Sequence, residues 1–159
     1  MIATPIEGLV LRPLRGSDAV ALHALMAANR AHLTAHGDFA TEVAASPAEI
    51  AAELDADGPH RRFGIVRHGQ LIGRIDLIAV DPPRYSLGYW LAEAATGQGF
   101  ALASLWALCE VARQLGASDL YAGVSHGNGR SVRLLQRAGF VPVERFERYT
   151  RFHLALGTG

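Results

Sequence analysis

The sequence predicts a mixed α/β fold of the α+β type, with a central sheet of about seven strands and about four helices. The first observation is a meander: three strand-like runs, over residues 62–67, 70–80 and 85–91, follow one another with only short turns between them. Strands joined this closely pair antiparallel. The second observation is a long helical run over residues 100–115, which separates the meander from a further strand over residues 119–125. A helical crossover makes the two strands that it joins parallel.

The composition is that of a globular protein and excludes several classes of function. Half of the residues are hydrophobic and 19% are charged, so we expect residues 1–159 to form a single domain with its own core. The net charge is zero and no basic stripe is visible, which argues against a nucleic-acid partner. All fifteen basic residues are arginine. The absence of lysine excludes a Walker-type phosphate loop and is typical of a GC-rich bacterial genome.

No signal peptide and no apolar run of membrane-spanning length is visible in the sequence. We therefore expect a cytoplasmic protein without a membrane partner. Seven histidines are present, and none is spaced as a metal ligand, so we expect no metal. The sequence does not decide between a monomer and a homodimer.

The remaining elements follow from local patterns on either side of the meander. Ser17 is a favoured N-cap for a first helix, and Ser46, followed by Pro47, opens a second helix. After the parallel strand, one more helix and a final pair of strands complete the sheet. The expected strands are 9–14, 141–147 and 150–156, the expected helices are 18–29, 47–57 and 130–138, and residues 30–45 are expected to be irregular.

The long helix carries an apolar stripe at alternating steps of four and three residues, which predicts a buried face. Gly116 is the residue expected just beyond the end of this helix. The single cysteine, Cys109, has no nearby histidine in the sequence, and inside a helix it is expected to be a small buried hydrophobe. The members of the stripe are Ala101, Leu105, Leu108, Ala112 and Leu115.

A glycine turn, Thr96-Gly97-Gln98-Gly99-Phe100-Ala101, joins the meander to the long helix. Two glycines at a strand-to-helix junction let backbone N–H groups converge with no Cβ in the way. The first turn of a helix leaves its N–H donors unpaired and carries partial positive charge. The turn therefore predicts a seat for a phosphate or pyrophosphate, made by the amides of Gln98, Gly99, Phe100 and Ala101. By itself the pattern is equally compatible with a flexible loop that has a glycine N-cap.

A second segment of interest begins at Asn128 and ends at Phe140. Asn128 is a favoured N-cap, whose side chain can accept from the N–H of Ser131. Gly139 and Phe140 predict a Schellman ending, with Phe140 packed on Leu135. These structural roles explain the whole segment without any chemistry.

The order of elements around both segments resembles the GNAT family of acetyl-CoA-dependent N-acetyltransferases. The family's cofactor motif reads Arg/Gln-x-x-Gly-x-Gly/Ala, and here Thr96 replaces the first long side chain. Asn-x-x-Ser before a helix that ends in Gly-Phe is similar to the RimJ/RimL branch, whose members acetylate N-terminal amines of ribosomal proteins. The strand at 9–14 and Asn-Arg-Ala-His-Leu at 29–33 are also similar to that branch. The resemblance covers nearly the whole chain and implies a fold whose two parallel central strands splay apart.

The resemblance also implies acetyl-CoA as the cofactor, with coenzyme A as the product, and direct attack of a primary amine on the thioester. The acetyl-pantetheine arm is expected to bind backbone groups at Leu91 in the gap between the splayed strands. Asn128 matches a residue that contacts the cofactor. Ser131 matches the residue that protonates the departing thiolate; since a thiol has a pKa of about 8.5, a neutral hydroxyl is an adequate donor. The cofactor-binding residues are thus expected to be Leu91, Thr96, Gly97, Gln98, Gly99, Phe100, Ala101, Asn128 and Ser131.

The expected catalytic residues are Ser131, Asp76 and Tyr89, the last two on the basis of a strand register. If the hairpin closes over residues 81–84, Asp76 lies opposite Tyr89 beside the acceptor. A surface ion pair with Arg74, on the same strand face, is the competing interpretation of Asp76. Two reserve candidates lie in the final hairpin, Glu144 and Glu147.

The expected acceptor is an amine of low pKa, the α-amino group of a protein, peptide or small metabolite. Family members that acetylate lysine often have a glutamate base in the strand that corresponds to residues 85–91, and this strand has no carboxylate. Asp38 and Glu42, in the polar segment after the first helix, are candidates to hold the cation of the acceptor. Both are equally compatible with solvated loop acids.

Two other classes of function compete with this interpretation. A nicotinamide-dependent oxidoreductase needs a third small residue after Gly97 and Gly99, where Leu102 stands, and Asp119 precedes a strand although a ribose-binding acid follows one. A non-catalytic acyl-CoA-binding module with the same fold is the second alternative, because Thr96 departs from the family motif. Release of coenzyme A over a panel of amines distinguishes a module from an enzyme.

Overall fold

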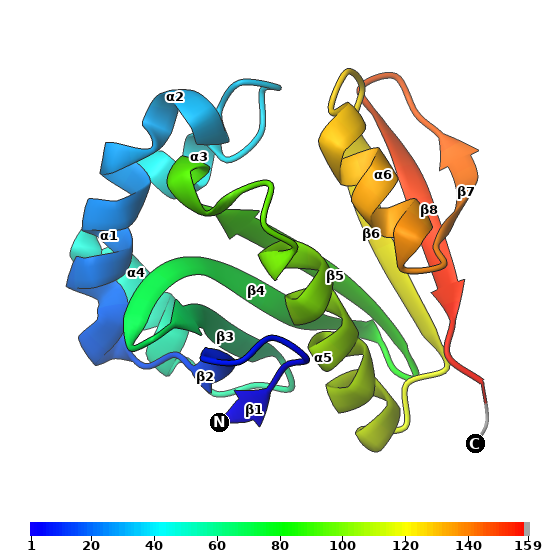
Figure 1. Cartoon of the computed structure of the whole chain (residues 1–159), viewed down its shortest axis with the longest axis horizontal. Coiled ribbons are helices and arrows are strands. Elements are labelled where there is room, and N and C mark those ends of the chain that lie inside the picture. Colours follow the sequence, from blue (N-terminus) through cyan, green and yellow to red (C-terminus); the bar gives the residue numbers. More distant parts are fainter. Residues whose placement is uncertain (158–159) are drawn as a thin grey trace.

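The structure, a computed structural model, describes residues 1–157, which form one eight-stranded sheet with helices on both faces (Figure 1). The strand order is β1-β2-β3-β4-β5-β6-β8-β7, and only β5 and β6 pair in parallel. The strands are β1 (Ile2–Ala3), β2 (Leu9–Pro13), β3 (Arg61–Arg67), β4 (Gln70–Asp81), β5 (Arg84–Leu91), β6 (Asp119–Ser125), β7 (Val141–Arg145) and β8 (Tyr149–Ala155). The helices are α1 (Ala19–Ala28), α2 (Arg30–Leu33), α3 (Ala40–Ala44), α4 (Pro47–Asp55), α5 (Phe100–Gln114) and α6 (Gly129–Arg137), with 3₁₀ turns at Gly16–Asp18 and Glu93–Ala95.

The predicted mixed fold and its antiparallel meander are confirmed. β1 is additional to the seven predicted strands, because two residues are too few for alternation to show in a sequence. The segment predicted as irregular contains α2 and α3. These helices have four and five residues, which is too short for a helical period to be visible.

The two predicted N-caps have different outcomes. Ser17 does not cap α1, because it lies inside the 3₁₀ turn Gly16–Asp18 and the cap position falls on Asp18. The Asp18 carboxylate accepts from the backbone N–H of Arg15 at 2.8 Å, which stabilises this extra turn before the helix. Ser46 caps α4 as predicted, and its hydroxyl accepts from the N–H of Glu49 at 3.1 Å.

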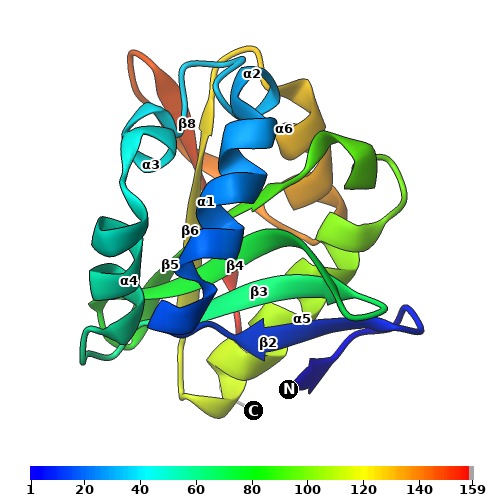
Figure 2. The ribbon, with the colours of Figure 1, turned by 90° about the vertical axis from the view of Figure 1, so that its left-hand side faces the viewer.

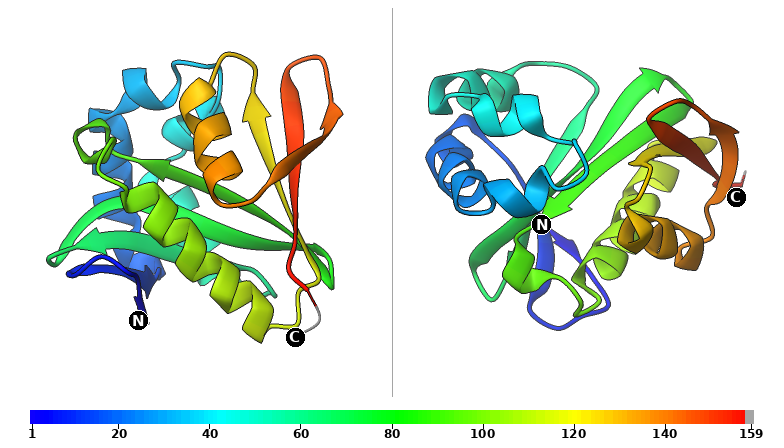
Figure 3. Two further views of the ribbon diagram at one scale, coloured as in Figure 1. Left: turned by 45° about the vertical axis from the view of Figure 1, so that its right-hand side comes forward. Right: turned by 90° about the horizontal axis from the view of Figure 1, so that it is seen from above.

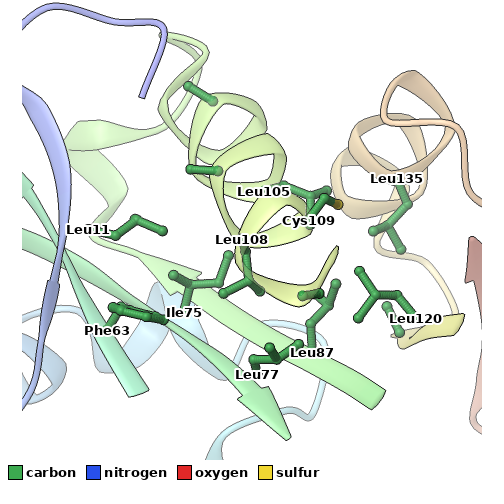
Figure 4. Close-up of a cluster of buried hydrophobic side chains, with 14 of the residues drawn as sticks. Leu11, Phe63, Ile75, Leu77, Leu87, Leu105, Leu108, Cys109, Leu120 and Leu135 are labelled. Atoms are coloured by element: carbon green, nitrogen blue, oxygen red, sulfur yellow. The ribbon is translucent and has the colours of Figure 1, made fainter. Parts of the chain in front are cut away.

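Helices cover the two faces of the sheet unequally, as Figure 2 and the two views of Figure 3 show. α5 and α6 lie on one face, and α1 and α4 on the other. The larger core lies under α5, where Leu105 and Leu108 pack against the strands (Figure 4). A second core packs Trp90 of β5 against α1 and α4. The predicted stripe on α5 is buried at Leu105, Leu108 and Ala112, but Leu115 is 38% exposed because the helix ends before it.

The ends of α5 and α6 agree with the sequence. Gly116 follows α5 with φ +82°, the left-handed conformation that favours glycine. The N–H of Phe140 donates to the carbonyl of Leu135 at 2.9 Å, which is the long bond of a Schellman ending. Cys109 is buried in α5 as predicted.

The parallel strands β5 and β6 stay paired over only three residues. The pairs run from Arg84 with Asp119 to Ser86 with Tyr121. Beyond them, β5 remains bonded to β4 as far as Leu91, and β6 remains bonded to β8 as far as Ser125. The sheet is therefore split from Ser86 onward, and the splayed central strands implied by the sequence are confirmed (Figure 1).

Candidate functional site: a cleft through the split sheet

A cleft of about 550 Å³ lies where β5 and β6 diverge. Its walls come from the end of β5, the glycine turn, the first turn of α5, one side of α6, and the segment that includes α2 and the loop before α3. The lining residues are His32, Leu33, Ala35, His36, Asp38, Phe39, Tyr89, Trp90, Leu91, Ala95, Thr96, Gly97, Gly99, Phe100, Ala101, Leu102, Asn128, Arg130, Ser131, Arg133, Leu134 and Arg137.

The cleft connects the two faces of the sheet. Successive side chains of a strand point to opposite faces. Leu87 and Leu91 of β5 belong to the core under α5, with Tyr89 packed against it, whereas Trp90 belongs to the core under α1 and α4. In β6, Val124 lies on the α5 face, so Ser125 lies on the other. A ligand on the side of Tyr89 and a ligand on the side of Trp90 thus meet in the gap between the strands.

The backbone of β5 offers free polar groups to this gap. The N–H of Ala92 donates to the carbonyl of Ile72 at 2.8 Å, toward β4. Backbone groups of successive residues point to alternate edges of a strand, so those of Leu91 and Tyr89 point away from β4. β6 has already diverged at this level. These groups are available to a ligand that lies between the strands, as expected for Leu91.

The glycine turn has the geometry of an anion seat. Gly97 and Gly99 have φ values of +77° and +82°, in the left-handed region that glycine adopts without strain. Gly99 is the N-cap of α5, and in the described part of the chain no protein acceptor is bonded to the N–H groups from Gln98 to Leu102. The first bond to the turn comes from the N–H of Ala103, to Gly99 at 3.1 Å. Several N–H donors therefore converge on the cleft.

The polar side chains of the turn bind inside the turn itself. The hydroxyl of Thr96 donates to the carbonyl of Glu93 at 2.6 Å, and the side-chain amide of Gln98 donates to the carbonyl of Ala94 at 3.1 Å. Gln98 does not line the cleft. An anion in this seat would therefore meet main-chain donors, and the loss of the long side chain at Thr96 leaves those donors in place.

Two hydroxyls meet across the cleft. The hydroxyl oxygens of Tyr89 and Ser131 lie 2.7 Å apart. Ser131 stands in the first turn of α6, where its N–H donates to the side-chain oxygen of Asn128 at 3.3 Å, the cap predicted from the sequence. Burial raises the pKa of Tyr89, and the hydrogen bond to Ser131 opposes that shift. Tyr89 is therefore a neutral donor throughout the neutral pH range.

The predicted pairing of Asp76 with Tyr89 is wrong. Asp76 lies opposite Gly88, and Tyr89 lies opposite Ile75, because a bulge between Ala79 and Asp81 shifts the register of β4 and β5 by one residue. A shift by one residue places a side chain on the other face of the sheet.

Asp76 instead belongs to an ion-pair cluster on the α4 face. Its carboxylate accepts from the guanidinium groups of Arg62 and Arg74, both at 3.0 Å. Asp76 does not line the cleft, and neither do the reserve candidates Glu144 and Glu147. The ion-pair interpretation of Asp76 is confirmed.

The structure adds arginine and histidine side chains that the sequence did not single out, and it places Asp38, one of the two acids considered for the acceptor cation, in the cleft. Arg130, Arg133 and Arg137 of α6 line the cleft. Their spacing of three and four residues places them on one helix face, a signal that the sequence contains. On the opposite side, His32, His36 and Asp38 line the cleft. Glu42 is exposed on α3 and does not line it.

Residues 8–141 match the family model of the acetyltransferase (GNAT) domain. This chain belongs to the GNAT acetyltransferase family. The GNAT match accounts for the glycine turn and the split sheet together, and it leaves the nicotinamide-dependent alternative without support. Asp119, the acid considered for that alternative, binds Ser118 and His153 at the start of β6. No curated protein sequence matches the chain.

Several solved GNAT structures share this fold. RimL, an alpha-N-acetyltransferase of a ribosomal protein in complex with coenzyme A, is 22% identical with a TM-score of 0.85, and the match covers 98% of each chain. Mycobacterium smegmatis RimJ with a CoA disulfide is 20% identical with a TM-score of 0.80, over 97% of this chain and 85% of that one. Vibrio cholerae spermidine N-acetyltransferase with CoA and spermine is 21% identical with a TM-score of 0.81, over 95% and 97%. The TM-scores establish a shared fold, and at these identities the resemblance to the RimJ/RimL branch is confirmed at the level of the fold.

No group of three or more His, Cys, Asp or Glu side chains in residues 1–157 could hold a metal ion. No helix in the same range has the length and apolar character needed to cross a bilayer.

Proposed function

We propose that this GNAT protein transfers acetyl from acetyl-CoA to the α-amino group of a peptide, a protein or a small metabolite. The observation that carries the proposal is the cleft itself. One opening is surrounded by main-chain donors suited to phosphates, and the hydroxyl pair of Tyr89 and Ser131 lies beside the strand gap. The oxidoreductase alternative has no comparable site.

The residues present fit acetyl-CoA. The unbonded N–H groups of the glycine turn suit a pyrophosphate, which is the role expected of Gly97, Gln98, Gly99, Phe100 and Ala101. Free backbone groups of Leu91 suit the amides of a pantetheine arm.

The α6 side of the cleft adds charge and a polar side chain to this fit. Arg133 and Arg137 bring positive charge to the wall of the cleft opposite the glycine turn, where further phosphate charge can be neutralised. Asn128 lies at the thioester end beside Ser131. RimL, RimJ and the spermidine enzyme are described as complexes with coenzyme A or its disulfide.

The chain's own residues then assist the transfer in two ways. Acetyl-CoA supplies an activated acetyl group and a leaving thiolate. Ser131, hydrogen-bonded to Tyr89, holds a proton at the position where the thiolate departs, and neutral hydroxyls suffice because a thiol has a pKa of about 8.5. Backbone N–H groups at the strand gap stabilise negative charge as it develops on the carbonyl oxygen.

The choice of an α-amino acceptor follows from the absence of a carboxylate base on β5. The carboxylate of Asp76 lies on the α4 face of the sheet, outside the cleft. At pH 7 about one lysine side chain in 2,500 is neutral, with a pKa of about 10.4, against roughly one α-amino group in ten, with a pKa of about 8. The difference corresponds to around 3 kcal/mol of deprotonation. A water chain or a weak base is enough for the α-amino group.

We also propose that the protein acts in the bacterial cytoplasm, as a monomer or a homodimer. RimL is described as acting on a ribosomal protein and the Vibrio cholerae enzyme on spermidine. Both are amines, which supports an amine acceptor here. Because one of these substrates is a protein and the other a polyamine, the class of amine that this protein acetylates has to be determined by experiment.

The test compares two short peptides with acetyl-CoA. One has a free N-terminus and no lysine, and the other has a blocked N-terminus and one lysine. We expect faster release of coenzyme A with the first. Faster acetylation of the blocked lysine peptide would contradict the choice of acceptor. Inactivity with both, and with a panel of small amines, would favour the alternative of a non-catalytic acyl-CoA-binding module.

A further inference from the structure

One hydrogen bond crosses the cleft on the side opposite Tyr89. Asp38 lies in the loop between α2 and α3, and Ser125 is the last residue of β6, 87 positions later in the sequence. The hydroxyl of Ser125 donates to a carboxylate oxygen of Asp38 at 2.5 Å. The bond joins the α2–α3 loop to the end of β6. It leaves the second oxygen of Asp38 without a partner in the described residues.

The charge of Asp38 is not compensated by the protein. It is the only acid among the residues that line the cleft. Among residues 1–157, no arginine or histidine nitrogen lies within ion-pair distance of its carboxylate. A half-buried carboxylate has lost part of its favourable hydration energy. The attraction of a bound cation offsets that loss. The cleft thus has a place for a positively charged group.

Asp38 and the hydroxyl pair of Tyr89 and Ser131 lie on opposite sides of the strand gap. Ser125 and Trp90 lie on the α1 face of the sheet, whereas Tyr89 and Ser131 lie on the α5 face. Asp38 is held to Ser125, so it stands on the side from which a second substrate reaches the gap if acetyl-CoA occupies the α5 side.

From this arrangement we propose that Asp38 binds the ammonium form of the acceptor amine, and that Ser125 fixes the carboxylate in position. The inference rests on the proposed function and deepens it. Asp38 is the anchor that places the amine at the gap, from which it loses a proton to water and attacks the thioester. One carboxylate matches one cationic group. The other ionisable groups that line this part of the cleft are His32, His36 and Arg130. None of them offers a second negative charge and the Arg130 guanidinium repels additional positive charge, so the acceptor class is a monoamine and not a polyamine.

Three variants separate charge from geometry. Asp38→Asn keeps an acceptor for the Ser125 hydroxyl and removes the charge. Ser125→Ala keeps the charge and removes the bond. Glu42→Gln is the matched control, since Glu42 lies in the same part of the chain and is exposed outside the cleft.

Each variant is assayed with two acceptors, a short lysine-free peptide with a free N-terminus and a simple hydrazide that is uncharged at pH 7. We expect Asp38→Asn to raise KM for the peptide by about 10- to 100-fold, with unchanged KM for acetyl-CoA and for the hydrazide. Ser125→Ala should raise the peptide KM by about three- to tenfold, because a carboxylate without its fixing bond is less well placed. Glu42→Gln should match the wild type. Spermidine should be a poorer acceptor than the peptide by at least about tenfold in kcat/KM.

An equal rise in KM for the peptide and the hydrazide would show that Asp38 only holds the loop in place, and the inference would be overturned. An unchanged peptide KM, or efficient turnover of spermidine, would overturn it as well. Calorimetry of the peptide with the CoA-bound protein separates this inference from the proposed function. If no acceptor is turned over but peptide binding still needs Asp38, the anchor stands and the catalytic proposal fails.

Discussion

The hydroxyl of Tyr89, at the end of β5, lies 2.7 Å from the hydroxyl of Ser131, in the first turn of α6. These residues are 42 positions apart in the sequence and come from opposite walls of the cleft. The bond can pass a proton in either direction, since each hydroxyl is both donor and acceptor. A thiolate that leaves beside Ser131 therefore has two hydroxyls in line as a proton source.

Ser131→Ala is expected to lower kcat by about ten- to a hundredfold, the lower part of what positioned proton transfer contributes. Affinity for acetyl-CoA should change little, because alanine keeps the backbone N–H that donates to the Asn128 cap, so the start of α6 is retained. Tyr89→Phe should lower kcat less than Ser131→Ala, since Ser131 remains in place. Stopped-flow and calorimetric measurements separate kcat from binding. A loss of thermal stability with unchanged kcat would leave the hydroxyl of Ser131 a structural role only, through its bond to Tyr89.

Gly99→Asp is expected to abolish binding of acetyl-CoA, because it places a negative charge on the seat for the pyrophosphate. Gly99→Asn is the matched control: asparagine has the same shape and tolerates the left-handed conformation of this residue. Apart from the adjacent residues of the chain, the nearest atom to a Cβ at this position is Cδ1 of Ile6 at 4.0 Å, so Gly99→Asn should retain most of the affinity. Gln98→Ala should bind normally. Equal affinity of the Asp and Asn variants, measured by calorimetry, would contradict the assignment of the seat.

Removing Arg133 and Arg137 together should weaken the binding of coenzyme A by about tenfold at low salt, with a smaller effect at high salt, as expected for charge neutralisation. The binding of acetyl-pantetheine, which has no phosphates, should not change. Arg113→Ala is a suitable control, since Arg113 is an exposed arginine of α5 that does not line the cleft. A loss that is equal for coenzyme A and acetyl-pantetheine would mean that the arginines shape the helix and do not bind phosphate.

Asp76→Asn should leave the pH–rate profile unaltered, in contrast to the role expected from the sequence. It should lower the free energy of unfolding by about 2 kcal/mol, because it weakens the pairing of two half-buried guanidinium groups. The side chains of Arg62 and Arg74 are 22% and 13% exposed. Urea unfolding beside steady-state kinetics provides the test. A change in an apparent pKa of the pH–rate profile in Asp76→Asn would support a catalytic role for Asp76 and contradict this prediction.

Stability should fall at alkaline pH through the buried thiol of Cys109. Burial raises the pKa of Cys109 from an ordinary value of 9.0 to about 11. Since the folded pKa exceeds the unfolded one, the contribution is complete below pH 9 and is lost as the pH rises toward 11. Between pH 8 and pH 10.5 the stability difference between wild type and Cys109→Ala should therefore shrink by about 2 kcal/mol. If the difference in unfolding free energy between wild type and Cys109→Ala, measured by urea unfolding, were the same at pH 8 and pH 10.5, this prediction would be contradicted.

Local signals in the sequence were sufficient for most of the fold. Helix α5 and the capping residues Ser46, Asn128 and Gly139 follow from interactions within a few residues of the chain, and these are visible in a single sequence. The short elements α2 and α3 were not predictable, because four or five residues carry no period. The parallel pairing of β5 and β6 was predictable from the intervening helix alone.

In the candidate site, too, the features set by local sequence were predictable and those set by long-range contacts were not. The amide seat around Gly99 depends on local backbone and could be predicted, as could the position of Ser131. The partner of Tyr89 could not, because it depends on how β5 and β6 diverge in space. Asp76 was misplaced because a single bulged residue in the hairpin reverses the face, and no composition signal marks that residue. The bond of Asp38 to Ser125 links segments that no local pattern connects.

The split of the sheet bears on how large an acceptor can be. Residues from both faces of the sheet line the cleft, so an acceptor bound on the Asp38 side, as proposed, would not share an entrance with acetyl-CoA bound on the α5 side. A substrate far bulkier than the cleft volume of 550 Å³ would need to insert only its terminal amine. The remainder of the substrate would stay outside the cleft, on the face that α1 and α4 cover. With that arrangement, coenzyme A and the acetylated product would depart in opposite directions, and neither would obstruct the other. A peptide tethered by its C-terminus to a bead should consequently be modified about as readily as the same peptide in free solution.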